Sequence, residues 1–286
     1  MPEDAVHNPE DVLRFIEVFG LAARQTGCLA RRLQGKIGLH DKAGHDTPES
    51  AALTPVDLAA QDVLLLALCD VFPQAAVDAE EKTESARIFR PEGAHAPVIV
   101  VDPIDGTLNY GEGLPDYAVM GAWIASGFYR AALVHFPHGG DLYWARQGSG
   151  CFVKKSGRGT VLAAMEALPA RVLATSGVPD DWCADLQDAG FEVSVSRCSA
   201  VDATAPVTGR AAAAITQGRP DRRRAIGFLP TLEAGGVVWT GDRWWGGEDP
   251  AGLTADRGLT VVADSRDTVA RIGHALRRHL KAVIGH

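Results

Sequence analysis

The chain has 286 residues, a length that suits one large domain or two modest ones. Hydrophobic residues make up 46% and charged residues 22%, an ordinary globular composition that excludes wholesale disorder and a fibrous repeat. The formal charge of −8 argues against nucleic acid or an anionic membrane as the main partner. If the substrate is also an anion, an acidic protein needs cations to hold it, which is a first indication of a metal.

The cysteines and the beginning of the chain indicate a reducing environment. Five cysteines lie at irregular spacing without a C-x-x-C pair, so neither a disulfide framework nor a structural zinc site is expected. The first residues, Met1-Pro2-Glu3-Asp4, are acidic and polar, unlike a signal peptide. The longest apolar runs, such as 63–69 and 98–101, are too short to span a bilayer. We therefore expect a soluble, cytoplasmic protein without a membrane partner.

Hydrophobic spacing predicts the elements of the first half. A long amphipathic helix is expected over 9–33, followed by a polar segment, 39–50, that is long enough to be a mobile flap. Thr54 is a favoured N-cap and is followed by a proline and an acid, so a second helix should begin there. Beyond it we expect a buried strand and then an antiparallel meander, over 98–101, 117–125, 131–136 and 141–145.

The second half alternates between predicted strands and helices. The boundary is expected between Gly150 and Pro169, which gives an N-terminal α+β half over 1–160 and a C-terminal α/β half over 161–286. Strands are predicted over 172–175, 191–195, 237–240 and 243–245, the last two forming a hairpin around Gly241-Asp242. Helices are predicted over 180–189, 199–209, the segment leading to Glu233, and 266–280.

The segment with the most chemical information is Asp102-Pro103-Ile104-Asp105-Gly106-Thr107, which directly follows the buried strand. Its two acids, three residues apart, lie on either side of a sharp turn in which Pro103 restricts the backbone and Gly106 leaves room for close approach. Two carboxylates and a carbonyl are hard oxygen ligands suited to Mg²⁺, and the amides of Gly106 and Thr107 could face a phosphate. The alternative is a turn that only caps a strand.

This string resembles the signature of the inositol monophosphatase family, Mg²⁺-dependent and typically Li⁺-sensitive phosphomonoesterases. Two adjacent glutamates upstream, Glu80-Glu81, and the downstream Glu233-Ala234-Gly235-Gly236 also match that family. The resemblance implies a layered αβαβα sandwich of α/β class, a Mg²⁺ cofactor and a small phosphorylated polyol or sugar as substrate. It also implies a homodimer. Nucleotide 3′-phosphates, fructose bisphosphate and histidinol phosphate are alternative substrates within the family.

The resemblance also assigns roles residue by residue. Metal ligation falls to the carboxylates of Glu80, Asp102 and Asp105 and to the carbonyl of Ile104. Thr107, paired with an acid, orients the attacking water; Asp57 is that acid or is simply a helix-start acid. Two groups of residues are expected to contact the substrate. The first is Asp105, Gly106 and Thr107. The second is Cys198, Ser199 and Ala200, for which plain packing is the alternative.

One departure from the family matters. Its second motif begins Trp-Asp, and that aspartate, ten residues before the Glu of EAGG, completes the metal site; here the position is Arg223. Asp221 either replaces the missing ligand or caps a helix. Arg223 either grips the phosphate in place of part of a metal's charge or belongs to a solvated basic turn. The remaining alternative is a family member that binds metal or a phosphorylated ligand without catalysing a reaction.

Overall fold

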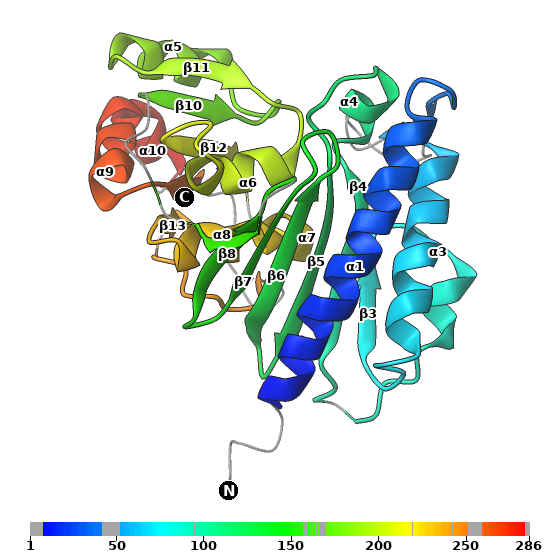
Figure 1. The fold of residues 1–286 in the computed structure, drawn as a ribbon. Helices are drawn as coiled ribbons and strands as arrows, with labels where there is room; N and C mark the ends of the chain where they lie inside the picture. Colours follow the sequence, from blue (N-terminus) through cyan, green and yellow to red (C-terminus); the bar gives the residue numbers. More distant parts are fainter. Residues whose placement is uncertain are drawn as a thin grey trace, which may run out of the picture.

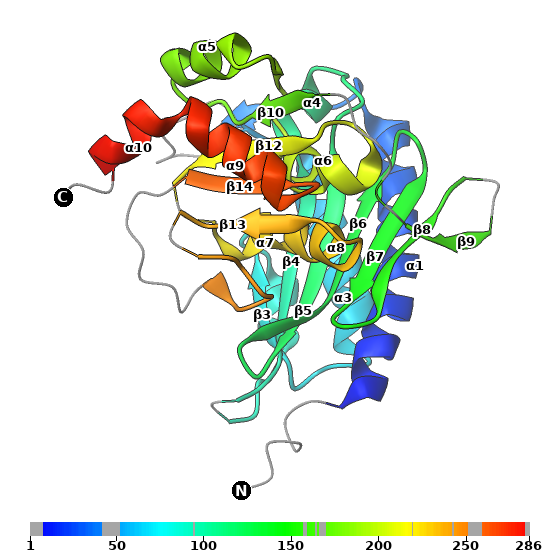
Figure 2. The ribbon, with the colours of Figure 1, turned by 90° about the vertical axis from the view of Figure 1, so that its left-hand side faces the viewer.

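The computed structural model describes residues 8–41, 52–93, 95–156, 159–163, 165, 170–218, 220–241, 243–250 and 259–283. These residues form a seven-stranded sheet, a five-stranded sheet and a two-stranded ribbon (Figures 1 and 2). Most of the predicted flap, 42–50, lies outside the described residues. None of the described helices combines the length and the apolar character that crossing a membrane requires.

The larger sheet has the strand order β3-β4-β5-β6-β7-β8-β9. β3 and β4 are parallel, and each of the other neighbouring pairs is antiparallel. The predicted meander is thus confirmed, and β8 and β9 extend it. The strands are β3 (Ala76–Ala79), β4 (Val98–Asp105), β5 (Ala118–Ala125), β6 (Phe128–Phe136), β7 (Asp141–Arg146), β8 (Gly150–Lys154) and β9 (Thr160–Leu162).

Two long helices, α1 (Pro9–Leu33) and α3 (Pro55–Cys69), cover one face of this sheet (Figure 1). The predicted bounds of α1 are confirmed, and α3 begins at the predicted cap, Thr54, whose side chain accepts the Val56 N–H. The sheet approaches α1 closely at Gly121, where an added Cβ would lie 2.2 Å from the Phe19 ring. Burial of this apolar face fixes the larger sheet against the helices.

The smaller sheet has the strand order β11-β10-β12-β14-β13. β10 is parallel to both of its neighbours, and β14 is antiparallel to both of its own. Neither β12 nor β14 was predicted from the sequence. The strands are β10 (Arg171–Ala174), β11 (Glu192–Val195), β12 (Ala213–Gln217), β13 (Val237–Trp239) and β14 (Leu259–Ala263).

The two sheets and three groups of helices form five layers (Figure 2). Side chains alternate across β4: Ile99 and Val101 pack in the cluster under α1 and α3, whereas Val100 faces the cluster between the sheets. The predicted αβαβα sandwich is therefore present. The helices between the sheets are α6 (Ser199–Thr208), α7 (Arg222–Ile226) and α8 (Phe228–Glu233); those on the outer face of the smaller sheet are α5 (Asp180–Asp188), α9 (Arg266–Ala275) and α10 (Arg277–Val283).

Three predictions about the second half need correction. The helical segment leading to Glu233 is two short helices that meet at Gly227, because Pro230 has no N–H with which to continue the helix. The predicted closing helix is likewise divided, into α9 and α10. Residues 243–245 form no regular strand, but they pair with the end of β13 as a hairpin would: the Trp245 N–H donates to the Val238 carbonyl at 2.9 Å and the Thr240 N–H to the Arg243 carbonyl at 3.0 Å, around an isolated bridge between Trp239 and Trp244. The short elements are β1 (His40–Asp41), β2 (Ala52–Leu53), the 3₁₀ helix η2 (Glu84–Ile88) and α4 (Thr107–Gly111).

Candidate active site

Acidic residues meet at the carboxyl ends of the two parallel strands of the larger sheet. Ala79 of β3 is paired with Val101 of β4, and the Glu80 N–H donates to the Val101 carbonyl at 3.2 Å. Since parallel strands end at the same edge of a sheet, Glu80 lies beside Asp102. A cavity of about 300 Å³ opens there; its lining includes Glu80, Asp102, Ile104, Asp105, Gly106, Thr107, Ser176, Arg197, Cys198, Ser199, Asp202, Gln217, Asp221, Arg223 and Arg224.

The turn that carries the acids needs a glycine. The pairing of β4 with β5 is irregular between Asp102 and Asp105, and Gly106 follows with φ of +81° at the start of α4. A Cβ on Gly106 would lie 2.8 Å from the Asp116 carbonyl oxygen and 3.1 Å from the Cys198 Cβ. Both the backbone conformation and the close approach therefore require the missing side chain.

The Asp105 carboxylate is bound to the beginning of α6. The Ser199 hydroxyl donates to its Oδ1 at 2.7 Å, and the Cys198 thiol at 2.8 Å and the Ala200 N–H at 2.7 Å donate to its Oδ2. Burial raises the pKa of Asp105, although these three hydrogen bonds act in the opposite direction. In this structure the Cys198–Ala200 segment holds Asp105, and its contact with substrate stays a prediction.

Asp102, which is buried, and Glu80, which is half-buried, form an acid pair. The Asp102 side chain is 4% exposed, and its Oδ1 is one of the few fully buried polar atoms in the described residues without a hydrogen-bond partner. Burial, and then repulsion from Glu80 and Asp105, raise the pKa of Asp102 well above its ordinary value. An oxygen buried in this way is poorly solvated until a cation or a donor completes it.

Asp57 plays two structural roles at once. At the third position of α3 it accepts from the Thr54 N–H at 2.8 Å, which is a capping box, and its other oxygen accepts from the Thr107 hydroxyl at 2.9 Å. The Thr107 hydroxyl also lies 2.8 Å from the Ile104 carbonyl oxygen. Burial raises the pKa of Asp57 to about 6. Both interpretations of Asp57 made from the sequence therefore describe contacts that exist.

In the second motif, which departs from the family pattern, Arg223 lies against the acid pair of Glu80 and Asp102. Asp221 is the N-cap of α7, and its Oδ1 accepts from the Arg224 N–H at 2.8 Å. The Arg223 guanidinium is 3.6 Å from Asp78, and attraction to Asp221, Glu80 and other acids raises its pKa despite its partial burial. Arg223 also attracts the charged form of Asp102, which acts against the rise in the pKa of that carboxyl caused by burial and by the neighbouring acids.

Arg222 fixes the helix that carries Arg223, and no signal in the sequence indicated this. Its guanidinium donates to Asp249 at 2.9 Å and 2.6 Å and to Asp78 at 3.0 Å. Its carbonyl accepts the Tyr129 hydroxyl at 2.6 Å. Because Asp78 precedes Glu80 by two residues, Arg222 ties the end of β3 to the beginning of α7.

The donor set can be compared with what a magnesium ion needs. Mg²⁺ binds one or two carboxylates and completes its shell with water and phosphate oxygens. Glu80, Asp102 and the Ile104 carbonyl offer such donors, and the unpartnered Asp102 oxygen is a ready ligand. No group of three His, Cys, Asp or Glu side chains close enough to hold a metal occurs in the described ranges. These residues therefore fit one divalent ion held jointly with a phosphate, rather than an ion held by side chains alone.

The fold and this pocket define an αβαβα protein with an acidic site at the edge of its larger sheet. A model of the inositol monophosphatase family matches residues 13–221. The chain therefore belongs to the inositol monophosphatase family, a family of phosphatases. The match ends at Asp221, so the arginines of α7 lie beyond it.

Relatives and solved structures are similar to this chain over most of its length. The putative Nus factor SuhB of Neisseria meningitidis is 27% identical over 251 residues, which cover 81% of this chain and 89% of that protein. The extragenic suppressor protein SuhB of Bartonella henselae superposes with a TM-score of 0.74 at 21% identity, covering 93% of this chain and 99% of that one. A crystal structure of an IMPase/NADP phosphatase complexed with Mg²⁺ and phosphate gives 0.70 at 20% identity over 92% and 95% of the two chains.

The need for a glycine in this turn can be tested by replacing Gly106 with alanine. We expect G106A to lower the free energy of unfolding by about 2 kcal/mol or more, because the new Cβ overlaps the Asp116 carbonyl in a strained conformation. Urea unfolding followed by circular dichroism measures the change. The matched control is G113A, since Gly113 has φ of +78° and nothing within 4 Å. Equal losses in the two variants would contradict the steric explanation.

Proposed function

We propose that the protein is a Mg²⁺-dependent phosphomonoester hydrolase that acts on a small phosphorylated polyol or sugar, and that it works as a homodimer. The observation that supports this most strongly is the hydrogen bond from Thr107 to the buried Asp57, directly beside the acid pair. A hydroxyl that is bound to a carboxylate of raised pKa is a suitable partner for a water that must lose a proton. Membership in a family of phosphatases supports the same proposal.

The divalent ion would be held by Glu80, Asp102 and the Ile104 carbonyl. When bound, Mg²⁺ supplies Lewis-acid polarisation of the phosphate and lowers the pKa of a coordinated water. A solved structure of an IMPase/NADP phosphatase was crystallised with Mg²⁺ and phosphate, which supports this choice of ion. Asp105 and Asp221, whose carboxylates are bound to α6 and to α7, complete the candidate ligand set.

The chain's own residues would orient the reactants. The Thr107 hydroxyl accepts a hydrogen bond from the water and donates one to Asp57. As the water loses its proton to Thr107, the hydroxyl proton of Thr107 passes to Asp57, so that one proton is taken up in all. The turn at Gly106 lets the phosphate approach the backbone amides of Gly106 and Thr107 without a blocking side chain. Asp105 keeps this turn fixed against α6.

Arg223 would supply a positive charge that other family members obtain from metal. Four carboxylates and a phosphate dianion carry about −6, and removing the second-motif aspartate leaves about −5. Two Mg²⁺ ions and one guanidinium would balance that charge, whereas a site that binds only one ion leaves about −2, which protons on the acids would have to offset. The planar guanidinium fits two phosphate oxygens at once. Its position near Glu80 and Asp102 supports this role.

A second candidate is a non-catalytic family member that binds metal or a phosphorylated ligand, or that acts through a protein partner. Two observations favour it. A guanidinium stands among the carboxylates where the family has an aspartate, and the relative from Neisseria is named a putative Nus factor. In this alternative the pocket would retain a phosphorylated ligand without hydrolysing it.

Release of phosphate from a panel of phosphomonoesters distinguishes the two candidates. We expect turnover that requires Mg²⁺ and is abolished by EDTA, with D102N reducing kcat/KM by about 100-fold or more, the scale of losing one charge at a reacting centre. The control is D141N, because Asp141 begins β7 and is not among the residues that line the cavity. No turnover above background on any ester would favour the binding protein.

Replacing Arg223 with aspartate tests its charge. We expect R223D to lower phosphate release at about 1 mM Mg²⁺ and to shift the Mg²⁺ requirement to higher concentration, because a carboxylate there must be balanced by a further ion. R223Q, which removes the charge without reversing it, should lie between wild type and R223D. A matched change outside the pocket, R87D on η2, serves as control. Unchanged turnover and unchanged Mg²⁺ dependence in R223D would reject this role.

A further inference from the structure

The three arginines of α7 differ in what they bind. Arg222 is ion-paired with Asp78 and Asp249, and Arg223 lies 3.6 Å from Asp78. The Arg224 guanidinium, by contrast, forms no hydrogen bond and no ion pair with any residue in the described ranges, although its backbone N–H is held by the cap of α7. The half-buried Arg224 guanidinium has lost part of its hydration, and no hydrogen bond within the described residues replaces it, so its charge is incompletely stabilised.

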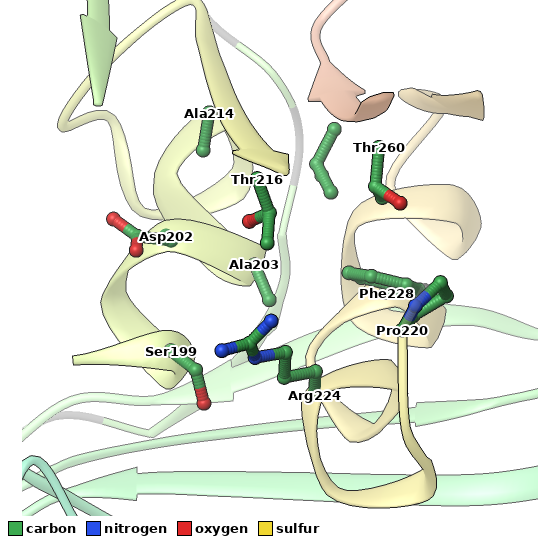
Figure 3. A pocket seen from close by; sticks show the side chains of 10 residues that line it. Ser199, Asp202, Ala203, Ala214, Thr216, Pro220, Arg224, Phe228 and Thr260 are labelled. Atoms are coloured by element: carbon green, nitrogen blue, oxygen red, sulfur yellow. The ribbon is translucent and has the colours of Figure 1, made fainter. Parts of the chain in front are cut away.

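Arg223 and Arg224 point to different ends of the same cavity. Successive residues of a helix are turned by about 100°, so neighbouring side chains diverge. Arg223 is directed to Asp78 at the end of β3, whereas Figure 3 shows Arg224 reaching from α7 toward the beginning of α6, with Ser199 and Asp202 on the opposite side. Both arginines line the cavity that contains Asp102. A ligand held at Arg223 therefore has a second fixed cation within the same pocket.

The space beside Arg224 is lined by apolar side chains, by uncharged polar ones and by one acid, Asp202. Thr216 and Ser199 line the space beside it, and Gln217 and Ser176 line the adjoining part of the main cavity. The acid that faces Arg224, Asp202, is 4% exposed, and its Oδ1 accepts the Ser196 hydroxyl at 2.7 Å. Burial raises the pKa of Asp202 to about 7, so this carboxyl is a weaker counter-charge than an ordinary aspartate.

From this geometry we infer that Arg224 forms a subsite for a second anionic group, so that the preferred phosphomonoester carries a carboxylate or a second phosphate on its alcohol part. The phosphate to be hydrolysed lies at the acid pair and Arg223, and the second group pairs with Arg224 through charge-assisted hydrogen bonds. This inference rests on the proposed function for its reaction but concerns binding, so the two can fail separately. The alternative is that Arg224 serves only to offset the charge of Asp202.

Two substrates that differ in one group test the subsite. Glycerol 2-phosphate becomes 2-phosphoglycerate when one hydroxymethyl group is replaced by a carboxylate. We expect wild type to prefer 2-phosphoglycerate by about 10-fold or more in kcat/KM, the value of one hydrogen bond between charged groups. In R224A the ratio should fall to about one, and R224K should keep part of it. Fructose 1,6-bisphosphate against fructose 6-phosphate separates a second phosphate from a carboxylate.

A binding measurement keeps the result independent of catalysis. Calorimetry with the same pair of compounds in EDTA should show the same preference in wild type and its loss in R224A. The control R87A removes an exposed charge on η2 and should leave both ratios unchanged. A ratio near one in wild type, or a ratio that R224A retains, overturns the subsite. An Arg224-dependent binding preference without turnover of any ester upholds the subsite and rejects the proposed hydrolase.

Discussion

The burial of Asp102 beside Glu80 is the constraint on which the site depends. Two carboxylates at the ends of neighbouring parallel strands cannot both be ionised in a poorly solvated position unless a cation accompanies them. The fold provides one such charge itself, because Arg222 binds Asp78 and Asp249 and so holds Arg223 against the pair. The remaining deficit is visible as an Asp102 oxygen without a partner. The divalent ion that we propose would remove this deficit.

The pocket also joins layers that are far apart in the sequence. Asp105 ends β4 in the larger sheet, and its carboxylate is held by Cys198, Ser199 and Ala200 at the beginning of α6, which lies between the sheets. Since one oxygen atom accepts from both a thiol and a backbone N–H, α6 has little freedom to move relative to the Gly106 turn. The Asp105 carboxylate therefore also fixes the α6 end of the cavity, where Arg224 and Asp202 lie.

How much the sequence predicts depends on how local the signal is. The helix 9–33 and the start of α3 were predicted correctly because amphipathic spacing and the Thr54 cap are local features. β3 was missed because its four residues, Ala76–Ala79, are few and half-buried and contain an acid. Counting along the second motif identified Arg223. The role of Arg222 could not be inferred, because its partner Asp78 is 144 residues away and the contact exists only in the folded chain.

The number of divalent ions bound with phosphate tests the charge balance most directly. Calorimetric titration of the protein with Mg²⁺ in the presence of inorganic phosphate, repeated with Mn²⁺ by electron paramagnetic resonance, counts them. If Arg223 provides the positive charge that the acid pair lacks, wild type binds one or two tightly held ions per chain and D102N binds fewer. Three tightly held ions in wild type, or no ion at all, would contradict this explanation.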